Sequence, residues 1–514
     1  MKRRANMQMG LNSKNTVLCL ASGLLSACAF PKLNLFFLMW IAFVPLVFVI
    51  MRTNAISSFL CGLLSGVAFN AIGLYWLVPM LHFNIASYVQ VAIAACSLWV
   101  YLALYWGIWS FALQKYISFQ KKNKLSNFFV IIFGSCLWVL LEYIRTYFFT
   151  GFPWMLIGYS QFEFTEIIQI AEFAGVYGVS FLILFCNLCF YFCITGENKK
   201  KYLYLALAFI ILFTLFGTYK IYKFRLLGDK EYSVSILQPN IDQYKKWDED
   251  YRQEILSNLQ KMALEVNKSK ADLVLWSETV LPGIVPQDSN LYSFAKELTV
   301  SAGGFNIFGS FYNEDNEKIF NVVLGFKGAD NYNPVHKKNH LVPFGEFIPF
   351  RKFFANFFGI LNKMGDVDKG SDANVFNYGE LFIGSTICSE NFFPDIARRF
   401  ALNGAKVLTN HTNDAWFFDT AAPCQHFMMN VFRAVENRKF VLVSANTGIS
   451  GIIESSGIII DKTEVSKKEL LSGTFFQNDF KTFYTKFGDV FVKICSIVLL
   501  VLVVFLLFRR RLIN

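Results

Sequence analysis

Long apolar runs, separated by short polar segments, fill the beginning of the chain and return at its end. A helix needs about 20 apolar residues to cross the hydrocarbon core of a bilayer. The pattern therefore predicts a polytopic helical membrane domain with about eight spans. The sixth run is long enough to tilt or to contain a break near Gly175. The runs are 14–31, 33–51, 56–80, 86–113, 127–147, 166–196, 202–222 and 485–508.

A different pattern fills residues 230–484, where short β-rich runs alternate with helical stretches. Apolar strands interleaved with helices are typical of sheets that helices bury. Residues 313–318 are polar and predict the turn of a hairpin. We expect a transmembrane domain with seven spans over 1–226, an α/β domain over 230–484 and a C-terminal transmembrane helix over 485–508. The expected strands are 232–240, 271–278, 305–312, 319–328, 380–388, 406–414, 440–448 and 450–460, and the expected helices are 247–268, 288–301, 393–405 and 424–439.

The composition agrees with a membrane protein, because 54% of the residues are hydrophobic, 18% are aromatic and only 17% are charged. These values exclude an ordinary soluble protein. The net charge of +11 could indicate a nucleic-acid partner. The position of the basic residues argues against that partner, because most of them flank the apolar runs on alternate sides.

That asymmetry indicates the orientation of the chain, because Lys and Arg are enriched in cytoplasmic loops. We expect both termini in the cytoplasm and the α/β domain on the outer face of the membrane, which is the periplasm in a cell with two membranes. Lys220, Lys223 and Arg225 depart from the pattern. The residues that follow it are Lys2, Arg3, Arg4, Lys14, Arg52, Lys115, Lys121, Lys122, Lys124, Lys199, Lys200, Lys201, Arg509, Arg510 and Arg511.

Three residues at the ends of strand-like runs form a candidate catalytic site: Glu278, Lys338 and Cys388. Only Cys424 accompanies Cys388 in the polar part of the chain, which indicates a nucleophile rather than a disulfide framework. A thiol needs a base or a positive field to become reactive. Glu278 can take the proton, and Lys338 can stabilise the thiolate and a later oxyanion. The backbone N–H after Cys388 is a second oxyanion donor, as at other strand-to-helix turns.

The sequence around these residues resembles the carbon–nitrogen hydrolase (nitrilase) superfamily, and within it the apolipoprotein N-acyltransferases. The stretches that carry the resemblance in the α/β domain are LQPNI, LVLWSETVLP, HKKNHLVPFGEFIP, ICSE, TNDAWF, QHFMMNVFRAVENR and NTGIS. In the apolar half, CAFPKLN, WVLLEYIRT and GFPWMLIGYSQ are also similar to that family. The resemblance implies an α-β-β-α sandwich joined to the membrane helices.

The resemblance also implies roles for single residues. Glu278 aligns with the base and Cys388 with the nucleophile, and the spacing Lys-x-His selects Lys338 over Lys337. The supporting residues that it implies are Glu346, which would orient Lys338 or Glu278, together with Glu390, Trp247 and Ser389. Ser389 stands where the family often carries an aromatic residue, which leaves open whether its side chain shapes the acyl pocket.

The family reaction transfers a fatty acyl chain from a glycerophospholipid, through a cysteine thioester, to the amino group of a diacylglyceryl-cysteine on a lipoprotein. A membrane-tethered amidase that transfers the acyl group to water is the alternative. A transporter or receptor with a degenerate nitrilase domain would lack catalytic residues, and none is missing. No cofactor is expected, and the histidines at 336, 340, 411 and 426 show no metal-ligand spacing.

Overall fold

The computed structural model describes residues 12–122, 126–196, 198–224, 228, 230–285, 287–314, 318–328, 333–351 and 366–513. The chain folds into two compact units. The helical unit comprises residues 1–82, 86–220 and 487–514, and the α/β unit comprises residues 83–85 and 221–486.

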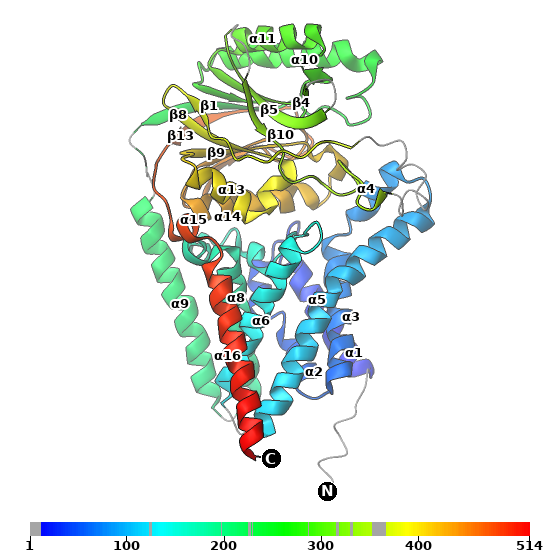
Figure 1. The fold of residues 1–514 in the computed structure, drawn as a ribbon, viewed down its shortest axis with the longest axis vertical. Helices are drawn as coiled ribbons and strands as arrows, with labels where there is room; N and C mark the ends of the chain where they lie inside the picture. The colour runs from blue at the N-terminus through cyan, green and yellow to red at the C-terminus, as the bar shows by residue number, and fades with distance from the viewer. Residues whose placement is uncertain are drawn as a thin grey trace. The chain divides into compact units, whose positions relative to one another are not determined.

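In the helical unit, fewer helices reach spanning length than the eight that the apolar runs predict. Six helices of the described residues are long and apolar enough to cross a membrane (Figure 1). They are α3 (Ala55–Gly73), α5 (Tyr88–Lys122), α6 (Asn127–Tyr147), α8 (Ala171–Thr195), α9 (Lys199–Phe224) and α16 (Val490–Ile513). The shorter helices are α1 (Ser13–Cys28), η1 (Phe36–Trp40), α2 (Val44–Ile50), α4 (Leu77–Asn84), η2 (Ile157–Gln161) and α7 (Thr165–Ile168).

The first two expected spans do not form single helices of membrane-spanning length. The first helix, α1, has 16 residues, which is below the length that crosses a bilayer unaided. The run 33–51 is divided into η1 and α2, with Pro45 in the first turn of α2. Proline lacks a backbone N–H and is tolerated at a helix start rather than inside a helix.

The break predicted in the sixth run is confirmed at Gly175. This residue has φ 61° and ψ −171° inside α8, a conformation that glycine adopts because it has no Cβ. The short helix α7 precedes α8 within the same apolar run.

The α/β unit contains two sheets. The first has the order β13-β1-β2-β4-β5-β6, with β3 beside β4, and the second has the order β12-β11-β10-β9-β8-β7. The strands of the first sheet are β1 (Glu231–Gln238), β2 (Leu273–Leu275), β3 (Ile284–Val285), β4 (Phe305–Glu314), β5 (Lys318–Lys327), β6 (Asn333–Lys337) and β13 (Glu469–Phe476). The strands of the second sheet are β7 (Phe376–Tyr378), β8 (Leu381–Ile387), β9 (Val407–Thr412), β10 (Val441–Ala445), β11 (Gly451–Ile453) and β12 (Ile459–Lys462).

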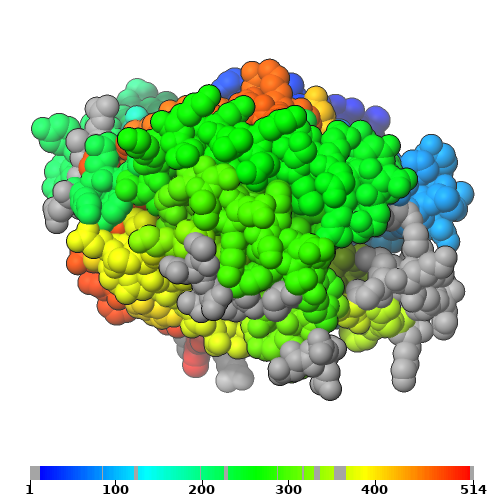
Figure 2. All heavy atoms as spheres, turned by 90° about the horizontal axis from the view of Figure 1, so that it is seen from above, coloured from blue at the N-terminus to red at the C-terminus, as the bar shows by residue number. Residues whose placement is uncertain are grey.

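Helices cover the outer faces of both sheets, so the α-β-β-α sandwich is confirmed (Figure 1). Helices α10 (Glu249–Asn267) and α11 (Ser289–Ala302) pack on the first sheet through residues such as Leu259 and Leu298. Figure 2 shows the surface that these two helices form. Helices α13 (Pro394–Leu402) and α14 (Ala422–Asn437) cover the second sheet. Ile307 and Leu442 belong to the apolar layer between the sheets.

The hairpin predicted around 313–318 is formed by β4 and β5, which pair antiparallel up to Glu314 and Lys318. Its turn, residues 315–317, lies outside the described residues. The strands β1, β2 and β4 run parallel, as do β8, β9 and β10. Parallel neighbours bring their carboxyl ends to one edge of a sheet. Glu278 follows β2 of the first sheet, and Cys388 follows β8 of the second.

Candidate active site

Cys388 lies at the turn between β8 and the short helix η4 (Cys388–Phe392), as the sequence predicts. Its φ is 49°, a left-handed conformation that is costly for a residue with a Cβ and is concentrated at functional sites. The side chain of Glu390 accepts a hydrogen bond from the Ile387 N–H at 2.8 Å. Asn410 donates to the Cys388 carbonyl at 3.2 Å. These contacts hold the strained turn in place.

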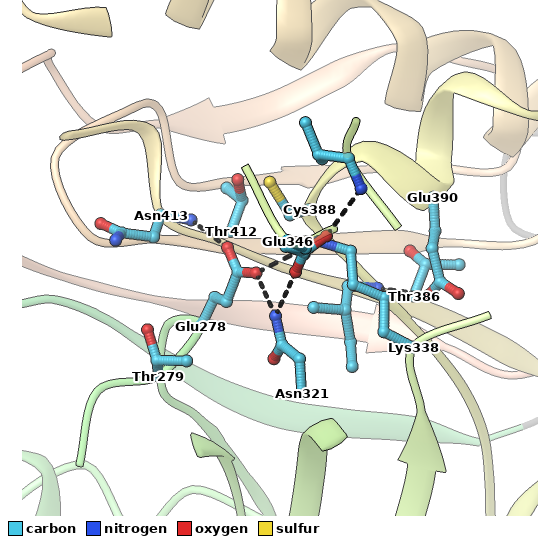
Figure 3. Close-up of polar contacts among 12 residues, drawn as sticks. Glu278, Thr279, Asn321, Lys338, Glu346, Thr386, Cys388, Glu390, Thr412 and Asn413 are labelled. Carbon is cyan, nitrogen blue, oxygen red and sulfur yellow. Dashed lines mark hydrogen bonds and ion pairs between the residues drawn. The ribbon is translucent and has the colours of Figure 1, made fainter. Parts of the chain in front are cut away.

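Glu278 follows β2 and is buried, with three donors facing its carboxylate (Figure 3). Oε1 accepts a hydrogen bond from Asn321 Nδ2 at 2.8 Å and lies 3.5 Å from Lys338 Nζ. Oε2 accepts from the Asn413 backbone N–H at 2.9 Å. These donors, which reach both carboxylate oxygens, fix the orientation of the Glu278 side chain.

Lys338 follows β6, and its side chain is only 1% exposed. Its Nζ lies 2.9 Å from Glu346 Oε1 and 3.5 Å from Glu278 Oε1. Burial works to lower the pKa of Lys338, but the Glu346 and Glu278 carboxylates outweigh it and raise that pKa above its ordinary value. Lys337 instead pairs with both carboxylate oxygens of Glu314 at 2.8 Å. The structure therefore brings Lys338, and not Lys337, to Glu278.

Glu346 contacts Lys338 directly and reaches Glu278 through Asn321. Asn321 Nδ2 donates to Glu346 Oε1 at 3.0 Å as well as to Glu278. Glu346 Oε2 accepts from the Val342 N–H at 2.8 Å. One lysine and one asparagine amide thus lie between two carboxylates, which keeps the like charges apart.

The thiol of Cys388 is not ionised by its surroundings alone. Burial and the Glu278 carboxylate raise the pKa of Cys388 above its ordinary value, while Lys338 lowers it. Figure 3 shows the side chain next to Glu278, Lys338 and Glu346. The arrangement therefore needs a base that removes the proton during attack, and Glu278 is the carboxylate that faces the thiol.

Glu390 connects the Cys388 turn to the segment that carries Lys338. It accepts hydrogen bonds from His336 Nε2 at 2.8 Å and from the Asn339 N–H at 2.5 Å, besides the bond from Ile387. Burial works to raise the pKa of Glu390, but His336 and the backbone donors hold it below its usual range. Within the described contacts, Glu390 does not touch Glu278 or Lys338, so its geometry is that of a positioning residue.

The other two predicted supporting residues are Trp247 and Ser389, and their described contacts do not join them to Glu278 or Lys338. Trp247 is 48% exposed, and its ring centroid lies 5.8 Å from that of Phe311. Ser389 is buried next to the nucleophile, and its Oγ has no hydrogen-bond partner among the described residues. Neither side chain contacts the Glu278 carboxylate in the described part of the chain.

Sequence reasoning missed several polar residues that surround the site. Asn321 lies in the middle of the apolar strand β5 and is 2% exposed, and such an interruption of an apolar run was its only sequence signal. Lys246 donates to the backbone oxygen of Glu278 at 3.3 Å and to Thr279 Oγ1 at 2.7 Å. Burial lowers the pKa of Lys246 to about 8. Lys246 lies directly before Trp247, but nothing in its local pattern marked it as buried.

The possible metal ligands are the His, Cys, Asp and Glu side chains of the described residues. Among the residues that the structure describes, no group of three or more His, Cys, Asp or Glu side chains is arranged to hold a metal ion. The side chains gathered here are a thiol, two carboxylates and an ammonium, which are groups that can carry acyl transfer through a covalent intermediate.

Both halves of the chain are similar to known proteins. A family model described as "Apolipoprotein N-acyltransferase N-terminal domain" matches residues 22–189, and one described as "Carbon-nitrogen hydrolase" matches residues 233–481. The apolipoprotein N-acyltransferase of Geobacter metallireducens is 32% identical over 97% of this chain and 96% of its own. The chain belongs to the apolipoprotein N-acyltransferase family. It is therefore a membrane-embedded acyltransferase with a carbon–nitrogen hydrolase domain.

Other relatives extend the same similarity. Apolipoprotein N-acyltransferase 1 of Treponema denticola is 29% identical over 96% of this chain and 97% of its own. Among solved structures, an amidase of the nitrilase superfamily from Nesterenkonia AN1 is 16% identical and covers 51% of this chain and 95% of its own. Its TM-score of 0.39 is too low to add to the family assignment.

Proposed function

We propose that this protein transfers a fatty acyl chain from a glycerophospholipid to the α-amino group of the diacylglyceryl-cysteine at the N-terminus of a lipoprotein. The observation that carries the proposal is the buried contact of Lys338 with Glu278 and Glu346 beside the strained Cys388 turn. The names of the relatives, which are apolipoprotein N-acyltransferases, support the choice of acceptor.

In the first half-reaction, the Glu278 carboxylate takes the proton of the Cys388 thiol as the sulfur attacks the ester carbonyl of the phospholipid. A carbon–sulfur bond forms, and the carbonyl oxygen becomes an oxyanion, which the Lys338 ammonium and the backbone N–H of Ser389 stabilise. The carbon–oxygen bond to glycerol then breaks. The departing alkoxide takes the proton from Glu278, so a lysophospholipid leaves and a thioester remains.

In the second half-reaction, the free amine of the lipoprotein attacks the thioester carbonyl. The amine gives a proton to Glu278, and a carbon–nitrogen bond forms. The carbon–sulfur bond breaks, and the Cys388 sulfur takes the proton back from Glu278. The products are the N-acylated lipoprotein and the resting enzyme, so the two substrates react in a ping-pong order.

Aromatic side chains near the loops that carry site residues support a substrate with an acyl chain. The Phe83 ring centroid lies 4.4 Å from that of Tyr244 and 5.4 Å from that of Trp416. Tyr244 is 68% exposed. Its neighbour Gln243 accepts a hydrogen bond from Asn413, the residue whose N–H binds Glu278. Exposed aromatic surface of this kind favours an apolar ligand.

The proposal is tested by following the acyl group on the intact protein. The full-length protein, incubated with phospholipid, should gain the mass of one acyl chain, and neutral hydroxylamine should remove it. Cys388→Ala should gain no mass, and Cys424→Ala should behave as wild type. A Cys388→Ala protein that still N-acylates a diacylglyceryl peptide would refute the mechanism.

The acceptor is tested by mixing the acylated protein with two peptides. A diacylglyceryl-cysteine peptide should receive the chain much faster than water does, because its lipid keeps the amine at membrane depth and raises its effective concentration. The same peptide without its diacylglyceryl group should be a poor acceptor. If water outcompetes both peptides, the protein acts as a hydrolase.

A further inference from the structure

His426 is a buried histidine on α14 that the acyl-transfer mechanism does not use. It is 1% exposed. Its Nδ1 lies 2.7 Å from Asp414 Oδ1, and its Nε2 lies 3.3 Å from the carbonyl oxygen of Cys388. Nε2 also lies 3.1 Å from Asn391 Oδ1. The ring therefore reaches from a buried carboxylate to the backbone of the nucleophile.

The partners of His426 decide its protonation. A backbone carbonyl has no proton to donate, and an ionised carboxylate has none either. Asn391 presents its oxygen rather than its nitrogen, because Asn391 Nδ2 donates to the His426 carbonyl at 3.4 Å. Asp414 Oδ1 also accepts from the Thr412 hydroxyl at 2.9 Å. Both ring nitrogens of His426 therefore face acceptor oxygens, those of Asp414, Cys388 and Asn391, which is the arrangement that an imidazolium satisfies.

We propose that His426 is a positioning residue that Asp414 holds as an imidazolium, and that it strengthens the oxyanion site by polarising the peptide bond between Cys388 and Ser389. The carbonyl oxygen of Cys388 and the N–H of Ser389 belong to the same peptide group. His426 and Asn410 both donate to that oxygen, at 3.3 Å and 3.2 Å. Donors on the oxygen draw electron density from the N–H and make it a stronger donor.

The same contacts explain why the Cys388 turn keeps its left-handed conformation. With φ at 49°, the peptide that follows Cys388 is held by its oxygen from two elements, α14 and β9. The inference rests on the proposed function, because it assumes that the Ser389 N–H binds the oxyanion of acyl transfer.

His411 provides an internal reference, because it is equally buried but has a different set of partners. Its Nδ1 lies 2.7 Å from the Trp276 carbonyl, and its Nε2 lies 3.0 Å from the Thr409 hydroxyl. The Trp276 carbonyl accepts the Nδ1 proton, and Nε2 meets a hydroxyl rather than a carboxylate, so no carboxylate holds a second proton on this ring. Burial lowers the pKa of His411 to about 4. The protein thus contains a neutral buried histidine against which His426 can be compared.

The charge of His426 is tested first, independently of activity. The full-length protein carries five histidines, so 15N-histidine NMR of the membrane-reconstituted protein gives few signals. At about pH 8, where a free imidazole is neutral, one ring should show both nitrogens protonated. His426→Gln should remove that signal, and Asp414→Asn should convert it to a neutral ring. A neutral His426 in the wild type at this pH would overturn the proposal.

Acylation kinetics test the consequence. His426→Gln, which removes the charge but keeps an N–H donor, should lower the rate constant of thioester formation about tenfold, and His426→Ala should lower it about 100-fold. The KM for phospholipid should change little, because the oxyanion forms only during reaction. His411→Gln is the matched control: it should lower thermal stability without changing the rate constant of the folded protein.

The outcomes separate this inference from the proposed function. A wild-type protein that forms no thioester refutes the proposed function, and the NMR signal still reports the charge of His426. A wild-type protein that acylates no faster than His426→Ala overturns the inference alone. If His426→Ala does not fold, the rate constant of thioester formation is compared between the wild type and Asp414→Asn. This variant should fold, because aspartate and asparagine have nearly the same size.

Discussion

The charge of Lys338 depends on two carboxylates that come from different segments of the α/β unit. Glu346 and Glu278 lie 2.9 Å and 3.5 Å from its Nζ. We expect Lys338→Ala to lower the rate of acyl transfer at least ~100-fold, since loss of one oxyanion donor has that effect in other enzymes. Lys337→Ala should change the rate little, because Lys337 pairs with Glu314 instead. Steady-state acyl transfer to a diacylglyceryl peptide measures both, and the reverse ranking would contradict the site.

Glu278 has two opposite effects on Cys388, and they can be separated. It is the proposed base, but its charge also raises the pKa of the thiol, after burial. Glu278→Gln should therefore abolish acyl transfer and yet lower the pKa of Cys388. The pH at which half of Cys388 is alkylated by iodoacetamide should move to lower values, as peptide mass spectrometry can measure. A midpoint that stays or rises would mean that Glu278 does not face the thiol.

At the scale of elements, the position of the base depends on a close approach between β4 and the segment after β2. A Cβ added at Gly309 would lie 2.5 Å from Glu278 Cα and 2.5 Å from Thr279 N. The backbone must therefore move if Gly309 is replaced. We expect Gly309→Ala to lower the rate of thioester formation by about 10- to 100-fold, because misplacement by about 1 Å can cost that much.

Gly473→Ala is the control for this substitution. Gly473 also lies in a strand of the first sheet, but its added Cβ would meet only Ile452 Cδ1, at 2.6 Å, which is the end of a flexible side chain. The control should retain the wild-type rate. Equal losses in the two variants would show that any added methyl in this sheet disturbs the site.

Strand β13, which the local sequence pattern did not predict, depends on a partner that is distant in the sequence. The strand β13 alternates between buried and exposed residues only weakly, and it was not predicted. It forms because it pairs along its whole length with β1, from Glu231 and Phe476 to Gln238 and Glu469. A strand that is completed by a partner at the other end of the domain carries a weak signal of its own.

At the scale of the whole molecule, the orientation in the membrane remains a prediction that the distribution of Lys and Arg supports. An alkaline phosphatase fusion after residue 300 should be active, because this enzyme needs the oxidising outer compartment to form its disulfides. A fusion after residue 124 should be inactive. Opposite activities would place the α/β unit in the cytoplasm and exclude the proposed periplasmic reaction.

The predicted domain boundaries at 226, 230, 484 and 485 also remain predictions. The boundaries between the two compact units lie near residue 220, inside α9, and near residue 486, shortly before α16 begins. Boundaries of this kind are hard to define from hydropathy, because a helix continues past the point at which its contacts change.

The sequence by itself determined the class of the molecule, and it predicted the residues of the candidate site. Long apolar runs predict membrane helices because a bilayer imposes a minimum length. Strand-like runs that end in Glu278, Lys338 and Cys388 predict three reactive groups at strand ends, and the sequence alone does not show that they come from two different sheets. Gly175 could be identified as a break because only glycine readily adopts its conformation.

Only the tertiary structure decided which groups surround these three. Asn321 lies between Glu278 and Glu346, and His426 reaches the Cys388 carbonyl, through contacts between segments far apart in the chain. Local pattern reports which face of an element is apolar, but it does not report which polar group from elsewhere will meet it.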